Sequence, residues 1–192
     1  MNLPNKITIS RILLAFIFMF FIFCHGLVFK ILALIIFSLA AVSDYYDGFL
    51  AKTRGLISDF GKIMDPIADK ILVLSAFLAF VQMQLVEAWM VVVIIFREFL
   101  ITSLRLYALN QGKVLAANRS GKHKTISQMV TIFLILIFIV LKEVLAQFNL
   151  WKNPFEIFYL RTIYVLMLVT VSLTIISGLA YLWENRKLII KV

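Results

Sequence analysis

Five aspartates, which are half of the ten acidic residues in this chain of 192, fall within one short stretch. Asp44 and Asp47 are three residues apart, and Asp65 and Asp69 are four apart. Both spacings place the two side chains of a pair on one face of a helix. The fifth, Asp59, directly precedes an apolar run, where it would help to cap the start of a helix. Two same-face pairs of carboxylates are left to explain.

Carboxylates gathered this densely could bind hard metal ions. Ionised and unpaired beside hydrocarbon they would repel one another and lose hydration, so some would stay protonated. Oxygen ligands of this kind suit Mg²⁺ or Mn²⁺, and four aspartates suffice to hold two ions that handle a phosphate group. The alternative is a set of structural salt bridges, whose partners would come from the same stretch: Lys52, Arg54, Lys62 and Lys70.

Small residues accompany both pairs of aspartates. Gly48 and Ala51 each lie four residues after an aspartate of the first pair, and Gly61 lies four residues before Asp65. Each acidic face therefore has a neighbour with little or no side chain, which lets another helix or a bulky ligand approach the backbone.

The composition predicts the kind of element that must position these residues. Hydrophobic residues make up 63% of the chain, and the mean hydropathy is +1.02, against about 45–50% apolar residues in soluble domains. We therefore predict an integral membrane protein. The net charge is +9, but the basic residues are spread over short loops, which argues against a nucleic-acid-binding face. A single cysteine, Cys24, excludes an intramolecular disulfide.

The hydrophobic pattern predicts an all-α, polytopic fold with six transmembrane helices in one bundle. Residues 1–192 would form a single domain, because no internal repeat or separate soluble region is visible. A short segment, Asn2 to Arg11, would lie along the membrane interface before an uncleaved first span. The apolar runs, each near the length of about 20 residues that crosses a bilayer, are 8–24, 28–51, 60–82, 87–109, 124–146 and 157–183.

The loop charges predict the orientation of this bundle. Twelve Lys and Arg residues fall on the side that holds both termini and the aspartates, and four fall on the other side. Because cytoplasmic loops carry the excess of basic residues, we expect the N- and C-termini and the acidic stretch to face the cytoplasm.

The spacing of the acidic stretch resembles the signature of the CDP-alcohol phosphotransferases, a family of membrane enzymes of phospholipid synthesis. The matching positions within residues 44–69 are Asp44, Asp47, Gly48, Ala51, Gly61, Asp65 and Asp69. One position departs from the pattern, because Lys52 stands where the family usually has arginine. Lysine keeps the charge but loses the two-pronged guanidinium, which puts that contact in doubt and leaves Arg54 to assist.

The resemblance implies a reaction and a role for each residue of the motif. Family members transfer the substituted phosphoryl group of a CDP-linked compound to an acceptor hydroxyl and release CMP. By the same resemblance the chain would be a homodimer in the cell membrane, with its active site facing the cytoplasm. Asp44, Asp47 and Asp65 would be ligands of two Mg²⁺ or Mn²⁺ ions, and Asp69 would be the general base and touch a metal as well. The residues that would contact the CDP-linked lipid are Thr8, Arg11, Gly48, Ala51, Lys52 and Gly61.

Basic residues further along the chain bear on the acceptor. Arg97 and Arg105 lie in an apolar run, and Lys122 lies in the sequence NRSGKHKTISQ. Together with NLPNKIT near the start, they resemble the branch of the family that joins CDP-diacylglycerol to glycerol 3-phosphate. That resemblance implies that these three residues bind the acceptor phosphate. The alternatives are that the arginines pair with Glu98 or an aspartate, and that Arg119 and Lys124 touch lipid headgroups.

Two other functions are weighed against this one. The first is another branch of the family, notably a cardiolipin synthase that uses phosphatidylglycerol as its acceptor. The second is a divalent-cation or proton-coupled transporter, because buried carboxylates also line ion pathways. Transporters tend to hold such groups near the midplane within inverted repeats, whereas these aspartates cluster toward one surface.

Overall fold

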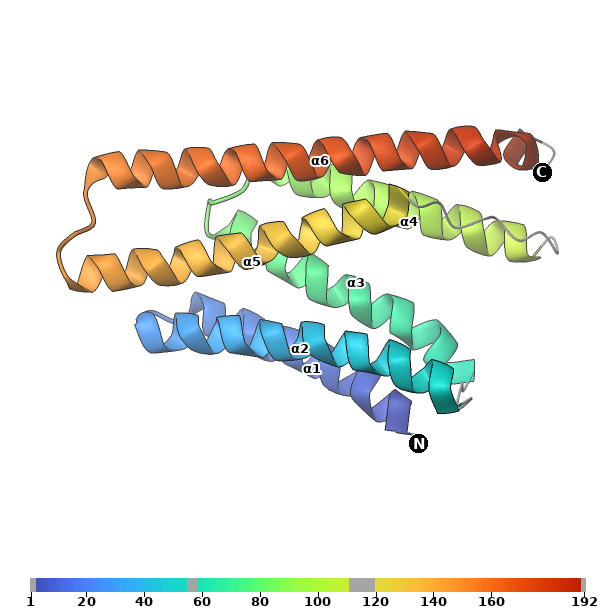
Figure 1. Ribbon diagram of the computed structural model, residues 1–192, viewed down its shortest axis with the longest axis horizontal. Coiled ribbons are helices and arrows are strands. Elements are labelled where there is room, and N and C mark those ends of the chain that lie inside the picture. The colour runs from blue at the N-terminus through green and yellow to red at the C-terminus, as the bar shows by residue number, and fades with distance from the viewer. Residues whose placement is uncertain (1–2, 55–58, 111–119, 191–192) are drawn as a thin grey trace.

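The computed structural model describes the backbone of residues 3–54, 59–110 and 120–190. Within these ranges it describes all side chains except those of residues 3–7, 44–54, 59–66, 69, 109, 110, 120–123, 153 and 187–190. The described chain forms six α-helices and no strand (Figure 1). They are α1 (Leu3–Phe23), α2 (Leu27–Arg54), α3 (Asp59–Gln82), α4 (Ala88–Asn110), α5 (Ser120–Gln147) and α6 (Asn153–Ile190).

Each of the six predicted spans corresponds to one helix, which confirms the all-α class. The largest difference is α6, whose 38 residues extend beyond the predicted 157–183 at both ends. Hydropathy marks where an apolar run stops, whereas a helix continues until a residue breaks it. Pro154 lies in the first turn of α6, where proline is tolerated, and the other residues that flank the predicted span include no glycine or proline. At the start of the described chain, the segment predicted to lie along the interface is continuous with the first span, because α1 runs unbroken from Leu3 to Phe23.

The helices pack in two groups joined through the middle of the molecule. In one group α1 packs against α2 and α3, and in the other α6 packs against α4 and α5. Contacts of α5 with α2 and α3, and of α3 with α4, join the groups. Because the helices run alternately up and down, the two termini lie at the same end (Figure 1).

We call this end, where α2 stops and α3 begins, the motif end, and the opposite end the far end. Two far-end turns close in the same way. After α3, Gln84 adopts a φ of 58°, and the Leu85 amide donates to the Phe80 carbonyl at 3.0 Å. After α5, Asn149 has a φ of 54°, and an equivalent bond closes the turn. This is the Schellman pattern, which satisfies the last carbonyls of a helix.

The core consists of narrow stripes along the helices. On α1 the buried side chains follow one another at intervals of three or four residues, and Phe18 meets Phe37 of α2 with ring centroids 5.4 Å apart. Intervals of this kind keep one helix face toward the bundle. The α1 stripe comprises Thr8, Arg11, Ala15, Phe18 and Ile22.

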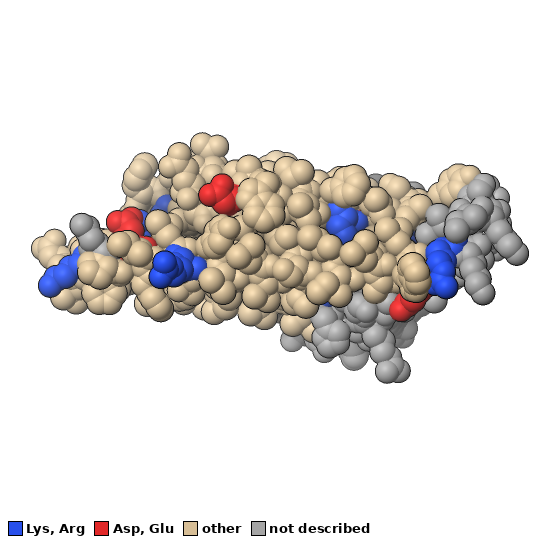
Figure 2. All heavy atoms as spheres, turned by 90° about the horizontal axis from the view of Figure 1, so that it is seen from above, with Lys and Arg blue, Asp and Glu red and all other residues tan. Residues whose placement is uncertain are grey.

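The outer surface is largely apolar. The face shown in Figure 2 carries few charged side chains among the residues it describes, and exposed large hydrophobic residues occur on all six helices. Two segments with described side chains, Lys124–Gln147 and Pro154–Arg186, are long and apolar enough to cross a membrane. Shorter apolar segments are Thr8–Phe23, Leu27–Ser43 and Lys70–Gln82.

Candidate functional site

The first pair of aspartates lies on the extension of the core stripe of α2. Ala33, Phe37 and Ala40 are buried at intervals of four and three residues. Continuing at intervals of four and three along the same helix reaches Asp44 and Asp47, whose side chains lie outside the described residues. The two positions therefore share the helix face that α2 turns toward the bundle.

The second pair occupies the equivalent place on α3. Leu72 and Ala76 are buried on this helix, and counting back from them by helical turns reaches positions 69 and 65. The side chains of Asp65 and Asp69 are likewise outside the described set. Because α2 and α3 pack against each other, both pairs of positions fall on inward faces at the motif end.

Several other predicted site residues also lie beyond the described side chains. Their backbones belong to α2, α3 and α5 near the motif end, and these residues are Gly48, Ala51, Lys52, Gly61 and Lys122. Among the side chains that are described, no three His, Cys, Asp or Glu residues gather as a metal site. The metal prediction thus concerns only the four aspartates, and it stays a prediction.

Two polar residues of α1 lie within its buried stripe. Thr8 and Arg11 are 0% and 1% exposed, and both have interaction partners. They are one helical turn apart at the motif end of α1, which packs against α2 and α3. A buried arginine needs compensating partners. The structure therefore brings two of the residues predicted to contact nucleotide onto the inner face of the bundle beside the aspartate-bearing helices.

A network of charged side chains joins α3, α4 and α5 at the same end. The Glu98 carboxylate forms ion pairs with Lys124 and, at 3.5 Å, with Arg97. Lys70, which directly follows Asp69 in the sequence, donates to the Glu98 carbonyl at 3.4 Å and to the Thr102 hydroxyl. These contacts, which we call the Glu98 network, connect the helix of Asp69 to the two helices that carry the predicted acceptor-binding residues.

Arg97 also reaches across to α6. Its Nη2 atom donates to the Ser177 hydroxyl at 3.0 Å. Gly178 makes room for this side chain, because a Cβ at that position would lie 3.2 Å from the Arg97 Cγ atom. The alternative of a pair with Glu98 is therefore seen for Arg97, and its guanidinium is fixed between α4 and α6. By contrast, Arg105 is exposed.

Lys124 does not lie where the headgroup interpretation places it. Its side chain is only 5% exposed and is paired with Glu98, so contact with lipid headgroups is wrong for this residue. The pairing of Glu98 with Arg97 was one of the expected alternatives, but its pair with Lys124 was not, because Lys124 belongs to another helix. Gln128 was also missed; it is buried one turn after Lys124, and its Nε2 atom has no hydrogen-bond partner.

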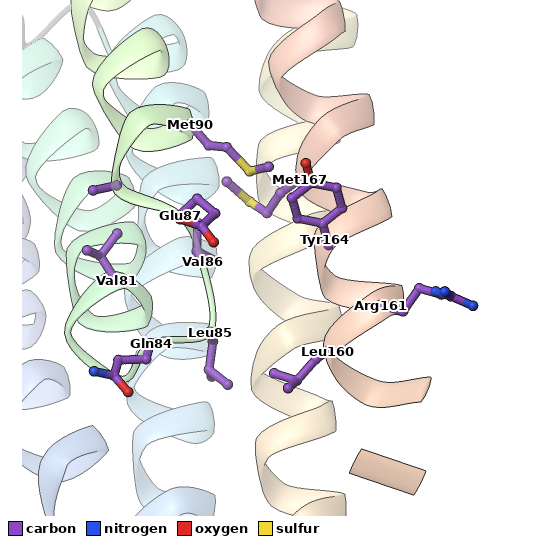
Figure 3. Close-up of a pocket in the computed structure, with 11 residues that line it drawn as sticks. Val81, Gln84, Leu85, Val86, Glu87, Met90, Leu160, Arg161, Tyr164 and Met167 are labelled. Carbon is purple, nitrogen blue, oxygen red and sulfur yellow. The ribbon is translucent and has the colours of Figure 1, made fainter. Parts of the chain in front are cut away.

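A cavity of about 610 Å³ lies at the far end, between the α3–α4 turn and α6 (Figure 3). Its walls are mainly apolar, with Met90 and Met167 on opposite sides, and the Arg161 side chain points away from it. It contains none of the predicted site residues. Size alone would favour it as a ligand site, but the concentration of buried polar groups favours the motif end.

The fold and this arrangement agree with the comparison of the sequence with known families. Residues 1–183 match the sequence profile described as CDP-alcohol phosphatidyltransferase. Because the match covers nearly the whole chain, the chain belongs to this family.

Individual relatives share a more specific description. The chain is 38% identical to the CDP-diacylglycerol–glycerol-3-phosphate 3-phosphatidyltransferase of Bacillus subtilis (strain 168), covering 96% of this chain and 95% of the relative. It is 27% identical to the protein of that name from Rickettsia felis, over 97% and 96% of the two chains. A probable phosphatidylglycerophosphate synthase of Mycobacterium tuberculosis (strain H37Rv) is 31% identical, over 94% of this chain and 79% of its own.

Proposed function

We propose that this protein transfers the phosphatidyl group of CDP-diacylglycerol to sn-glycerol 3-phosphate, giving phosphatidylglycerophosphate and CMP. The observation that carries this proposal is the 38% identity to the Bacillus subtilis enzyme over nearly the full length of both chains. A shared fold alone would not define the acceptor, but here several relatives with the same described activity align over almost the entire sequence.

In the proposed reaction a hydroxyl oxygen of glycerol 3-phosphate bonds to the phosphorus that carries diacylglycerol. The bond from this phosphorus to the oxygen bridging the diphosphate breaks, and CMP leaves with that oxygen. Asp69 takes the proton of the attacking hydroxyl. A carboxylate is a weak base, so its contribution depends on its position next to the acceptor.

The four aspartates would hold two divalent cations. The fit rests on two positions from each of two packed helices, all on the extension of inward faces at one end. Bound there, Mg²⁺ or Mn²⁺ would offset the negative charge of the diphosphate and of the departing CMP. Gly48 and Ala51 would leave space for the cytidine, while Thr8 and Arg11 lie on the neighbouring buried face of α1.

The acceptor phosphate would be bound by cationic side chains of α4 and α5. We assign this role to Arg97, Arg105 and Lys122. The guanidinium of Arg97 is held in place by Glu98 and by Ser177 of α6. Guanidinium groups match the geometry of phosphate oxygens with paired donors. Lys52 would contact the CDP group in place of the usual arginine.

We place the whole chain in the cell membrane as one domain of six spans. The largely apolar surface and the long apolar helices support a membrane location. The motif end would face the cytoplasm, where CDP-diacylglycerol in the leaflet can meet a water-soluble acceptor. The family resemblance further suggests a homodimer.

A CMP-release assay on the purified protein tests the function. CDP-diacylglycerol would be supplied with glycerol 3-phosphate, phosphatidylglycerol, serine or an inositol phosphate, in the presence of Mg²⁺ or Mn²⁺. We expect turnover with glycerol 3-phosphate and formation of phosphatidylglycerophosphate. Turnover with phosphatidylglycerol alone would instead define a cardiolipin synthase, and no CMP release with any acceptor would refute the transferase function.

A further inference from the structure

The structure assigns to Glu98 the role of a positioning residue that fixes the cations of the acceptor pocket. This inference rests on the proposed function, since it concerns how the chain binds the phosphate of glycerol 3-phosphate. It follows from the Glu98 network, whose members come from three helices and meet at one residue.

The carboxylate of Glu98 is placed to hold cationic side chains and not to face water. Glu98 is 15% exposed, and its partners Arg97 and Lys124 are 13% and 5% exposed. At this degree of burial an ion pair is poorly screened, and loss of the Glu98 charge removes an anionic partner from both cations. The positions of Arg97 and Lys124 therefore depend on the charge of Glu98.

The backbone of Glu98 also contacts α3, the helix that carries the proposed base Asp69. Its carbonyl accepts hydrogen bonds from Lys70 at 3.4 Å and from the Thr102 hydroxyl at 2.8 Å. Lys70 in turn contacts Thr102 and directly follows Asp69 on α3. One residue thus sets the spacing between α3, with its base, and the cations of α4 and α5.

The charges of the network are suited to an anion. Among the described side chains, three cations gather at Glu98: Arg97 and Lys124 pair with its carboxylate, and Lys70 donates to its backbone carbonyl. Such a group attracts a phosphate ester while the carboxylate keeps the cations from moving apart. Loss of the Glu98 charge should therefore weaken acceptor binding and leave CDP-diacylglycerol binding unaffected.

Steady-state kinetics on the purified full-length protein can separate this role from a merely structural one. We expect Glu98→Gln to raise the KM for glycerol 3-phosphate by about 10- to 100-fold, as for loss of a hydrogen bond to a charged group. The KM for CDP-diacylglycerol should change by less than about twofold. Misfolding would reduce the amount of active enzyme and so lower the apparent kcat, but it would leave both KM values unchanged.

Conservative variants keep the test decisive if Glu98→Gln does not fold. Glu98→Asp retains the charge and should restore most of the affinity for glycerol 3-phosphate. Thr102→Val removes one hydroxyl of the network without changing any charge, and should raise the same KM by a few-fold. The matched control is Glu156→Gln, which breaks an ion pair with Lys142 at the far end and should leave both KM values unchanged.

The possible results are distinguishable. An unaltered KM for glycerol 3-phosphate in Glu98→Gln and Thr102→Val, or equal changes in both KM values, would overturn the positioning role. Absence of wild-type activity with glycerol 3-phosphate would instead refute the proposed function.

Discussion

The two ends of the bundle use charged side chains differently. At the motif end, Glu98 pairs with its neighbour Arg97 and, across helices, with Lys124, and the side chains are only 5–15% exposed. At the far end, Lys142 and Glu156 pair at 3.2 Å but are 39% and 45% exposed. Exposed pairs contribute little to stability, whereas buried ones fix the geometry around them.

Lys30 completes the contrast. It is buried near the far end, where its Nζ atom donates to the Ile22 carbonyl at 2.6 Å. Ile22 lies in the last turn of α1, whose carbonyls lack partners within the helix. The described polar contacts at the far end are thus a half-exposed ion pair and a bond that closes the end of α1, while those at the motif end are buried and surround the proposed site. Substitutions at the two ends should therefore separate activity from stability.

Metal removal should produce the largest effect. Chelation with EDTA is expected to abolish CMP release, and added Mn²⁺ or Mg²⁺ should restore it, because the diphosphate then regains charge compensation. Asp44→Ala should be inactive even with added metal. Full activity of the wild type in EDTA would refute the two-metal hypothesis. It would also remove the proposed metal site as the chemical difference between the motif end and the far end.

Asp69→Asn should have the next largest effect. We expect turnover to fall by about 10²- to 10⁴-fold, the usual contribution of a general base. Binding of CDP-diacylglycerol should persist, which a thermal-shift titration with this lipid can measure. Near-normal turnover would exclude Asp69 as the base.

Lys30→Met tests the far end and should affect stability alone. The variant keeps an apolar stem but removes the donor to the Ile22 carbonyl, leaving that acceptor unsatisfied at a cost of about 1–3 kcal/mol in the free energy of unfolding. Thermal unfolding in detergent should show a lower midpoint. Both KM values and the kcat per folded protein should match the wild type; a selective change in one KM would contradict the division between the ends.

Glu156→Gln should have the smallest effect. Its pair with Lys142 is half-exposed, so the free energy of unfolding should change by less than about 1 kcal/mol. The same thermal and kinetic measurements apply. A large loss of activity would show that the far end influences the chemistry.

Much of the fold could be predicted because hydrophobic length and spacing determine it locally. The runs 28–51 and 60–82 match α2 and α3 closely. The end of α6 could not be predicted from hydropathy, because the four polar residues after Trp183, residues 184–187, interrupt the apolar run although the helix continues through them. Helix ends depend on backbone hydrogen bonding and not on apolarity alone.

The candidate site divides in the same way. The spacing of the aspartates within a helix could be read from the sequence, and the buried stripes of α2 and α3 continue at helical intervals toward positions 44, 47, 65 and 69, whose side chains lie outside the described residues. The contacts of Glu98 with Lys124 and Lys70 could not be predicted, because these residues are 26 and 28 positions away along the chain and lie on other helices. Such contacts depend on which helices pack together.

The turn after α1 also offers a way to determine sidedness. Cys24 is the only cysteine of the chain and lies at the far end, partly accessible, just beyond Phe23. A membrane-impermeant maleimide applied to intact spheroplasts would therefore react with the unaltered protein only where this turn faces outward. The native chain thus carries one chemical reporter of its own topology, opposite to the end where the lipid would be made.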